Sequence, residues 1–532
     1  MLGAFRRVGE VTEDLKPPVE ERRSPADWST FHALRRLPLL GDQRPPLVPT
    51  PARGPSLTRT SILLALDLDG RGDIAQPSPL SIQLHAPGRD SRQMALSTEL
   101  TTRLLGAIET DSLFFLCGAG LSMAPPSDLP SAVKVAHTCY DLWCNTEALD
   151  PGLRDNIDLL AAHFHSRGDF TSLFIPLVPW NELVGLPNRG HAAIADLLIS
   201  RAASGALSAN FDPMIERWAE DHKIAMQGAL TGQEAVTFQS VTNPLIKFHG
   251  CLHRNRPETL WTYGQLLEPA VQARVTSCSQ WINLHLPGKH LVVVGFWTDW
   301  GYLNEALAQA FTVANASSVT VVDPSPAADL QMKAPDLWAK LNGLSALFEH
   351  VPESGADALD ELRAAFSRTW ARKFYALGLP LLQSAGATVR IPATPDALSG
   401  DELYNLRQDA QGVPYTRAAT LKAPAPNAGQ AALVHTMLLN AGATQRGAWL
   451  EHGGRSIRVV NGAGQGLADV ESRYKEPTTV PQPEIVVCAG AIQLGVPASI
   501  VPSGHGASVV RPAPGGGAKW ITLEEAQAEW GP

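Results

Sequence analysis

The stretch FLCGAGLS, residues 115–122, joins a buried-strand pattern to a glycine turn and decides how the surrounding chain is interpreted. The apolar run 112–117 predicts a strand, and Gly118, Ala119 and Gly120 follow it directly. Glycines at the end of a strand let backbone amides approach a phosphate. The same pattern also fits an ordinary tight strand-to-helix turn, so the turn alone does not identify a site.

Short apolar runs alternate with helical segments around this turn. Further strands are expected at 205–210, 245–250, 291–296 and 318–323, and helices at 96–109, after Pro130 and at 357–377. Such alternation is typical of a parallel sheet covered by helices. The sequence therefore predicts an α/β fold with a Rossmann-like doubly wound parallel sheet over residues 95–378.

Polar residues or glycines follow each of these strands. They are Asn210 and Asp212, His249, Gly295 and Asp299, and Asp323. Open α/β sheets bind ligands at the carboxyl ends of their strands. Each residue taken singly also fits a turn or a helix cap, but together they predict a dinucleotide site.

In these motifs the sequence resembles the sirtuins, whose pattern is Gly-Ala-Gly-x-Ser, then Thr-x-Asn-x-Asp, then His-Gly, then a glycine-containing strand end. The corresponding stretches here are GAGLS, SANFD, FHG and VVVGF, spread over about half of the chain. Sirtuin deacylases also carry a zinc ribbon with four cysteine ligands between the last two motifs. This interval holds Cys251 and Cys278 alone, and no Cys-x-x-Cys occurs in the chain, so we expect no metal. The Phe-Arg stretch of deacylases is also missing after Ser122, where MAPPSDLPSA stands.

Both departures resemble the sirtuin-like effectors of bacterial anti-phage defence, which share the glycine loop, an NFD, a KxHG and a GxxxxD strand end. The stretch GHAAIADLL, 190–198, is similar to that subfamily as well. The resemblance implies an NAD glycohydrolase that releases nicotinamide and a linear or cyclised ADP-ribose. It implies that Asn210 orients the attacking water and the ribose, and that His249 accepts a proton from a ribose hydroxyl or from that water.

The resemblance also implies a set of NAD-binding residues. Gly118, Ala119, Gly120 and Ser122 would cradle the pyrophosphate, and Asp212 would brace Asn210 or the loop. Asp323 would meet the adenosine ribose, as an acidic residue does in many dinucleotide folds. Gly295 and Asp299 complete the set, Asp299 in the aromatic stretch FWTDWGY.

Three other functions remain open. A sensor could bind NAD or ADP-ribose without turnover, although the presence of both Asn210 and His249 favours an enzyme. A deacylase or ADP-ribosyltransferase would need the peptide groove that the absent zinc ribbon helps to form. A structural filament or scaffold subunit is compatible with the C-terminal half, which offers no recognisable chemistry.

The 532-residue chain is long enough for a main domain with additional segments on either side. Residues 1–94 are interpreted as a Pro-rich extension with short strands at 60–69 and 80–87. Residues 379–532 are interpreted as an α+β domain for regulation or assembly, with strands at 456–460, 484–490 and 507–510. The glycine run in VNGAGQGLADVE, 460–471, lacks the Lys-Ser/Thr of a nucleotide-binding loop, which favours a structural turn.

Charge and hydropathy limit the partners. A net charge of −9 without a basic field argues against nucleic acid as a partner. No apolar run of about 20 residues and no signal-peptide pattern is found, and the six cysteines are irregularly spaced. We therefore expect a cytoplasmic protein without a membrane partner. We also expect a homo-oligomer that responds to a phage-derived activator or to a partner protein of the same defence system.

Overall fold

The computed structural model describes residues 95–531 with gaps at 299–300, 312–314, 388–391, 393, 395–397, 413–421, 448, 474–482 and 493–517. The expected N-terminal extension and the strands expected at 60–69, 80–87 and 507–510 lie outside the described residues. All described residues belong to one compact unit, Gly88–Pro532. Within these ranges, every helix is too short or too polar to cross a membrane.

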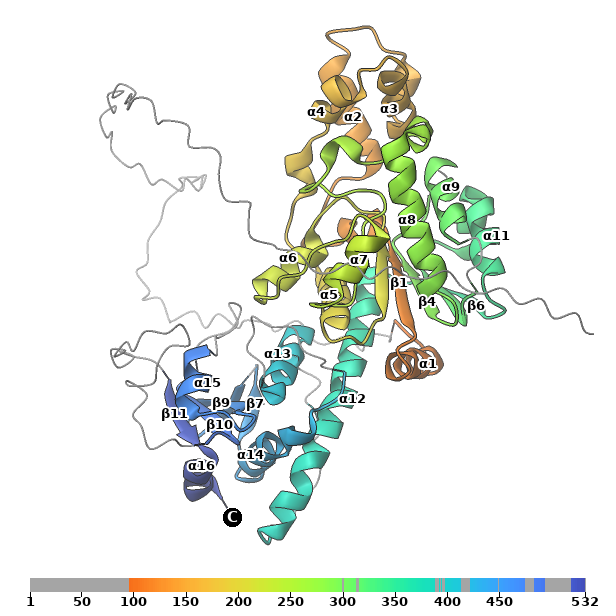
Figure 1. Ribbon diagram of the computed structural model, residues 1–532. Helices are drawn as coiled ribbons and strands as arrows, with labels where there is room; N and C mark the ends of the chain where they lie inside the picture. Colours follow the sequence, from red (N-terminus) through yellow and green to blue (C-terminus); the bar gives the residue numbers. More distant parts are fainter. Residues whose placement is uncertain are drawn as a thin grey trace, which may run out of the picture. The chain divides into compact units, whose positions relative to one another are not determined.

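Six parallel strands form the first sheet, in the order β3-β2-β1-β4-β5-β6 (Figure 1). They are β1 (Leu113–Cys117), β2 (Gly205–Ser208), β3 (Leu245–Ile246), β4 (His290–Val294), β5 (Ser318–Val322) and β6 (Phe348–Val351). This order is that of a doubly wound sheet, in which the chain changes direction between β1 and β4 and leaves a crevice at their carboxyl ends. The predicted Rossmann-like sheet is confirmed.

Two strands differ from expectation. β3 ends at Ile246, because Lys247 to Gly250 turn away, with Gly250 at a φ of +113°. β6 was not expected, since its four residues at the sheet edge are half-buried and include Glu349 and His350. An edge strand of this kind lacks the apolar run by which the other strands are recognised.

Twelve helices connect or cover these strands. They are α1 (Thr98–Glu109), α2 (Ala132–Trp143), α3 (Ile157–Ser166), α4 (Ile175–Leu177), α5 (Arg189–Ile199), α6 (Met214–Asp221), α7 (Gly232–Phe238), α8 (Pro269–His285), α9 (Gly301–Ala310), α10 (Ala327–Lys333), α11 (Pro335–Gly343) and α12 (Gly355–Ser384). Side-chain caps define several of their starts: the Ser97 hydroxyl accepts from Leu100 N–H, and Asn188 opens α5 with a capping box.

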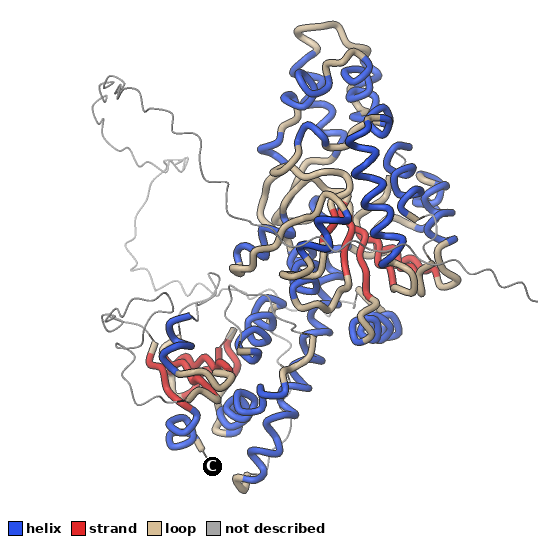
Figure 2. Tube along the Cα trace, viewed as in Figure 1, coloured by secondary structure: helices blue, strands red, loops and turns tan. Residues whose placement is uncertain are grey.

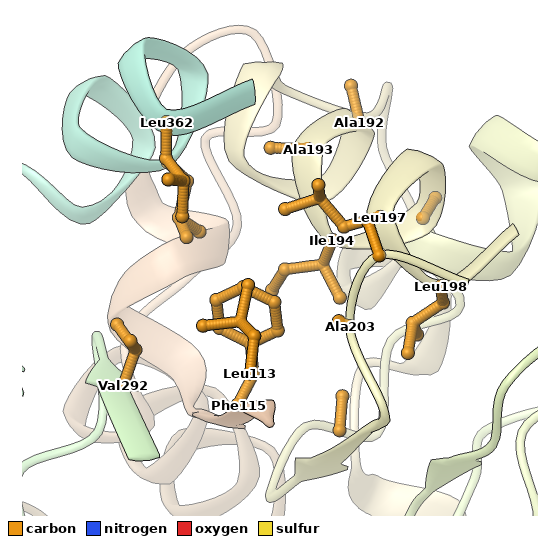
Figure 3. Packing of buried hydrophobic residues seen from close by; sticks show 14 of the residues in the cluster. Leu113, Phe115, Ala192, Ala193, Ile194, Leu197, Leu198, Ala203, Val292 and Leu362 are labelled. Atoms are coloured by element: carbon orange, nitrogen blue, oxygen red, sulfur yellow. The ribbon is translucent and has the colours of Figure 1, made fainter. Parts of the chain in front are cut away.

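The core lies on both faces of the sheet, because side chains alternate along each strand. Leu113 and Phe115 of β1 pack with α5 and with Leu362 of α12 (Figure 3). Phe114 and Leu116 point to the opposite face, where they pack with Trp281 of α8. Burial on both faces explains why the strand residues are apolar without alternation.

A second sheet follows in the order β11-β10-β9-β8-β7, and Figure 2 shows its strands as a separate red group. The strands are β7 (Thr444–Arg446), β8 (Trp449–His452), β9 (Arg455–Asn461), β10 (Ile485–Ala489) and β11 (Lys519–Thr522). They are accompanied by α13 (Gly400–Gln411), α14 (Gly429–Asn440), α15 (Leu467–Arg473) and α16 (Leu523–Trp530). The strands expected at 456–460 and 484–490 are confirmed as β9 and β10.

The glycine run after β9 closes a turn. Gly462 N–H donates to Ala489 O at 2.6 Å, and Gly464 N–H donates to Gly490 O at 2.9 Å. Because these amides join the ends of β9 and β10, they serve the structural turn that the sequence favours.

Helix α12 joins the residues on either side of the expected boundary at 378. It runs without interruption to Ser384, and its Gly378 lies against the backbone of Ala432 in α14. The division into 95–378 and 379–532 stays a prediction.

Candidate active site

A cavity of about 740 Å³ lies at the carboxyl ends of the strands of the first sheet. Loops after β1, β2, β3, β4 and β5 all reach it, together with the first residues of α2 and α3. Figure 1 shows α2, α3 and α4 gathered beyond the strand ends. The volume is in the range of small-molecule and cofactor sites. Eight of the predicted residues line the cavity: Ala119, Gly120, Ser122, Asn210, Asp212, His249, Gly295 and Asp323.

The glycine loop packs tightly against the end of β4. Gly118 N–H donates to Val294 O at 3.1 Å, and Gly120 N–H donates to Gly295 O at 2.8 Å. A Cβ on Gly118 or Gly120 would come within 2.9 Å of Gly295 O. These glycines therefore bring two loops together, and their amides are already used inside the protein. Gly118 is not among the residues that line the cavity.

Asn210 presents one unused acceptor. Its Nδ2 donates to Gly118 O and to Ser122 Oγ, both at 3.1 Å. Its Oδ1 is buried and has no hydrogen-bond partner among the described residues, and Asn210 is 6% exposed. A buried carbonyl oxygen left without a partner is costly, so a ligand or water that donates to Oδ1 would be stabilised here.

The hydroxyl of Ser122 is at the centre of a buried polar network. Its Oγ donates to Asp212 Oδ2 at 2.8 Å, and it lies 3.0 Å from His191 Nε2 in addition to Asn210. Since these bonds use the hydroxyl proton and both lone pairs, Ser122 is held inside the loop. No nucleophilic role follows from this arrangement.

The carboxylate of Asp212 connects the glycine loop to the start of α6. Its Oδ1 accepts from Met214 N–H at 3.2 Å while Oδ2 holds Ser122. Lys247, fully buried after β3, donates to the carbonyl of Asp212 at 2.6 Å and to Glu216 at 3.1 Å. The segment 210–212 is therefore held by Ser122, which follows β1, and by Lys247, which follows β3.

His249 is enclosed by aromatic rings and holds a neutral imidazole. Nδ1 lies 2.7 Å from Ala209 O and therefore carries the proton, which leaves Nε2 to accept from Tyr302 OH at 3.2 Å. Phe211 stacks on the ring with centroids 4.4 Å apart. Burial lowers the pKa of His249 to about 3.

The remaining predicted residues lie apart from this network. Asp323 Oδ1 accepts from Ser325 N–H at 2.9 Å, and both residues line the cavity on the β5 side. Gly295 adopts a φ of +57° where its loop meets Leu121. Asp299 lies outside the described residues.

Several lining or supporting residues were not predicted, among them the following four. Asp158 and Trp261 line the cavity, His191 contacts Ser122, and Tyr302 contacts His249. Burial raises the pKa of Asp158, at the start of α3. Of these, His191 lies in the stretch GHAAIADLL, three residues after Asn188, which caps the start of α5. This spacing is the sequence signal that could have identified His191.

No group of three or more metal-ligating side chains is found among the described residues. The six cysteines, all of which fall within the described ranges, are free, and five of them are buried.

Solved structures of Sir2 proteins overlap half of the chain. A Sir2 homologue in complex with NAD is 17% identical, covers 50% of this chain and 93% of its own, and has a TM-score of 0.30. A mutant Sir2 homologue in complex with ADP-ribose is 14% identical, covers 51% of this chain and 96% of its own, and has a TM-score of 0.28. No family model and no curated protein matches the chain. The Rossmann-like fold is established by the strand order of the first sheet.

Proposed function

We propose that this chain is an NAD glycohydrolase that cleaves the nicotinamide–ribose bond in the cavity above β1 and β4. The observation that carries the proposal is Asn210, which lines the cavity and whose buried Oδ1 has no hydrogen-bond partner among the described residues. The expected product is nicotinamide with ADP-ribose, linear or cyclised.

The chemistry fits the neutral and acidic character of the site. In the hydrolysis, the C1′–N bond breaks with its electron pair going to nicotinamide, and a water oxygen bonds to C1′. The transition state has oxocarbenium character, so nearby acceptors and carboxylates stabilise it. Asn210 Oδ1 would accept a hydrogen bond from the water or the ribose, and Asp158, when ionised, would add negative charge to the cavity lining.

His249 receives a limited role in this proposal. A ring with a pKa of about 3 is a weak base, and Tyr302 OH already donates to its Nε2. To accept the proton of the water or of a ribose hydroxyl, it must first release Tyr302, and it then passes the proton on to solvent. The pyrophosphate would meet the loop at Ala119 and the ammonium of Lys333, which also lines the cavity.

The biological setting proposed is NAD depletion in anti-phage defence, by a homo-oligomer that is activated by a phage-derived signal or a partner protein. The sequence motifs GAGLS, NFD and KxHG support it.

Nicotinamide release from NAD tests the proposal. We expect wild-type protein, with or without extract from phage-infected cells, to release nicotinamide, and Asn210→Ala to lower kcat by about 100-fold or more. His249→Ala is expected to lower it as well. Asn145→Ala removes an exposed asparagine in the turn that follows α2, outside the cavity, and should leave turnover unchanged. Binding of NAD without turnover under either condition would instead support a sensor, and release that requires an acylated peptide would support a deacylase.

A further inference from the structure

We infer that His191 is a positioning residue, which through Ser122 fixes the side-chain amide of Asn210 so that its oxygen is left for the substrate. The inference rests on the proposed NAD cleavage for its kinetic consequence. It deepens that proposal by naming a buried residue outside the cavity wall on which the reaction depends.

The first step is the tautomer of His191. Asn188 N–H donates to His191 Nδ1 at 3.2 Å as part of the capping box that opens α5. Nδ1 is therefore an acceptor, and the ring proton must be on Nε2. Burial lowers the pKa of His191, which keeps the ring neutral at neutral pH.

The second step is the hydroxyl of Ser122. Nε2–H of His191 donates to Ser122 Oγ across 3.0 Å, so the hydroxyl cannot donate back to the ring. The hydroxyl proton is left for Asp212 Oδ2 at 2.8 Å. One lone pair of Oγ then remains, and it can be filled only by a donor.

The third step is Asn210. The group that faces Ser122 Oγ at 3.1 Å must be the NH₂ of the amide, because a carbonyl oxygen there would meet a lone pair. Gly118 O, 3.1 Å from the same Nδ2, requires a donor as well. The amide is thereby held with Oδ1 turned from the network, which is the orientation that the proposed reaction uses.

The burial of the four side chains makes this dependence strong. His191 is 0% exposed and Ser122 is 2% exposed, so the hydrogen bond between them is formed in a buried environment, where the loss of a donor is costly.

The tautomer can be measured without any substrate. Two-bond ¹⁵N–¹H spectra of histidine-labelled protein, with the His191 signals assigned by their loss in His191→Gln, should show the proton of His191 on Nε2. A proton on Nδ1 would overturn the inference, whether or not the protein hydrolyses NAD.

Kinetics with NAD test the consequence. His191→Leu removes the donor, and we expect kcat to fall about tenfold with KM changed less than about twofold, because the loss concerns orientation in the transition state. His191→Gln can place an N–H near the position of Nε2 and should recover most of kcat, although it loses the cap to Asn188 N–H just as leucine does.

His222→Leu is the matched control. His222 is also buried, at 2% exposed, with Nδ1 2.8 Å from Trp218 O, and it does not line the cavity. It should lower stability without lowering kcat. Equal losses of kcat in His191→Gln and His191→Leu would overturn the positioning role, and so would a loss in His222→Leu as large as in His191→Leu. Absence of turnover in the wild type would instead refute the proposed NAD cleavage, and the tautomer would still be decided by the spectra.

Discussion

Burial keeps the imidazole of His435 neutral at pH values at which a histidine in water is partly protonated. His435 in α14 is 4% exposed and packs edge-on against Phe374 of α12, 5.4 Å between centroids. Its Nδ1 has no hydrogen-bond partner in the part of the chain that the structure describes, and burial lowers the pKa of His435 to about 4. In the folded state His435 therefore stays unprotonated at pH values below the ordinary pKa of histidine, at which the same residue in the unfolded chain binds a proton.

This difference predicts acid sensitivity. Because the unfolded state binds more protons, stability from His435 is present above about pH 6.5 and is lost as the pH falls toward 4. At pH 5 the loss from this residue is on the order of 2 kcal/mol. His435→Leu should therefore show a smaller drop in Tm between pH 7.5 and pH 5 than the wild type. An equal drop in both proteins would show that His435 does not contribute.

Glycine residues allow two loops of the candidate site to pack closely against each other. The loop after β1 and the loop after β4 touch along their backbones, and Gly295 at a φ of +57° is the point of closest approach. A side chain at this position would meet the backbone of Leu121 and Gly120. The position thus requires glycine both for its conformation and for its space.

Gly295→Ala should therefore lower Tm by several degrees and weaken binding of ADP-ribose. The left-handed conformation costs an alanine about 1 kcal/mol, and the contact with the loop adds to it. Gly106→Ala in α1 is the control, since a Cβ there meets nothing within 4 Å and alanine favours a helix. Thermal unfolding and titration calorimetry measure both effects. A wild-type Tm in Gly295→Ala would contradict this account of the loop contact.

The first sheet and the C-terminal elements are joined by a buried ion cluster. Asp196 of α5, 0% exposed, accepts from Arg363 of α12 at 2.7 Å and from Arg407 of α13 at 2.5 Å. Burial by itself would raise the pKa of Asp196, but the two guanidinium groups hold it below its usual value. Such clusters contribute less to stability than to a unique arrangement of the elements that they join.

Removal of one partner should be costly. Arg407→Met leaves Asp196 buried with less compensation, and we expect a loss of about 3–5 kcal/mol in the free energy of unfolding. Arg455→Met removes an arginine of the exposed pair with Glu529 and should cost less than about 1 kcal/mol. Urea unfolding of both variants tests this contrast. Similar small losses in the two would mean that α13 is not held to α5 by this cluster.

The sequence by itself determined the first sheet and the edge of it at which the candidate residues meet. Five of the six strands of the first sheet were predicted from apolar runs. Because parallel strands end at one edge, Asn210, His249, Gly295 and Asp323 had to meet there, although up to about 110 residues separate them. The half-buried edge strand β6 escaped prediction because it carries no such run.

The tertiary structure alone decided which atoms remain available. The amides of Gly118 and Gly120 are used by β4, Ser122 is satisfied within the loop, and Nε2 of His249 is met by Tyr302. Such pairings join residues 53 to 176 positions apart, and a shift of a few tenths of an ångström changes their strength. A residue pattern records which side chains reach the strand ends, whereas the packing of the loops sets which donors and acceptors are still free to meet a substrate.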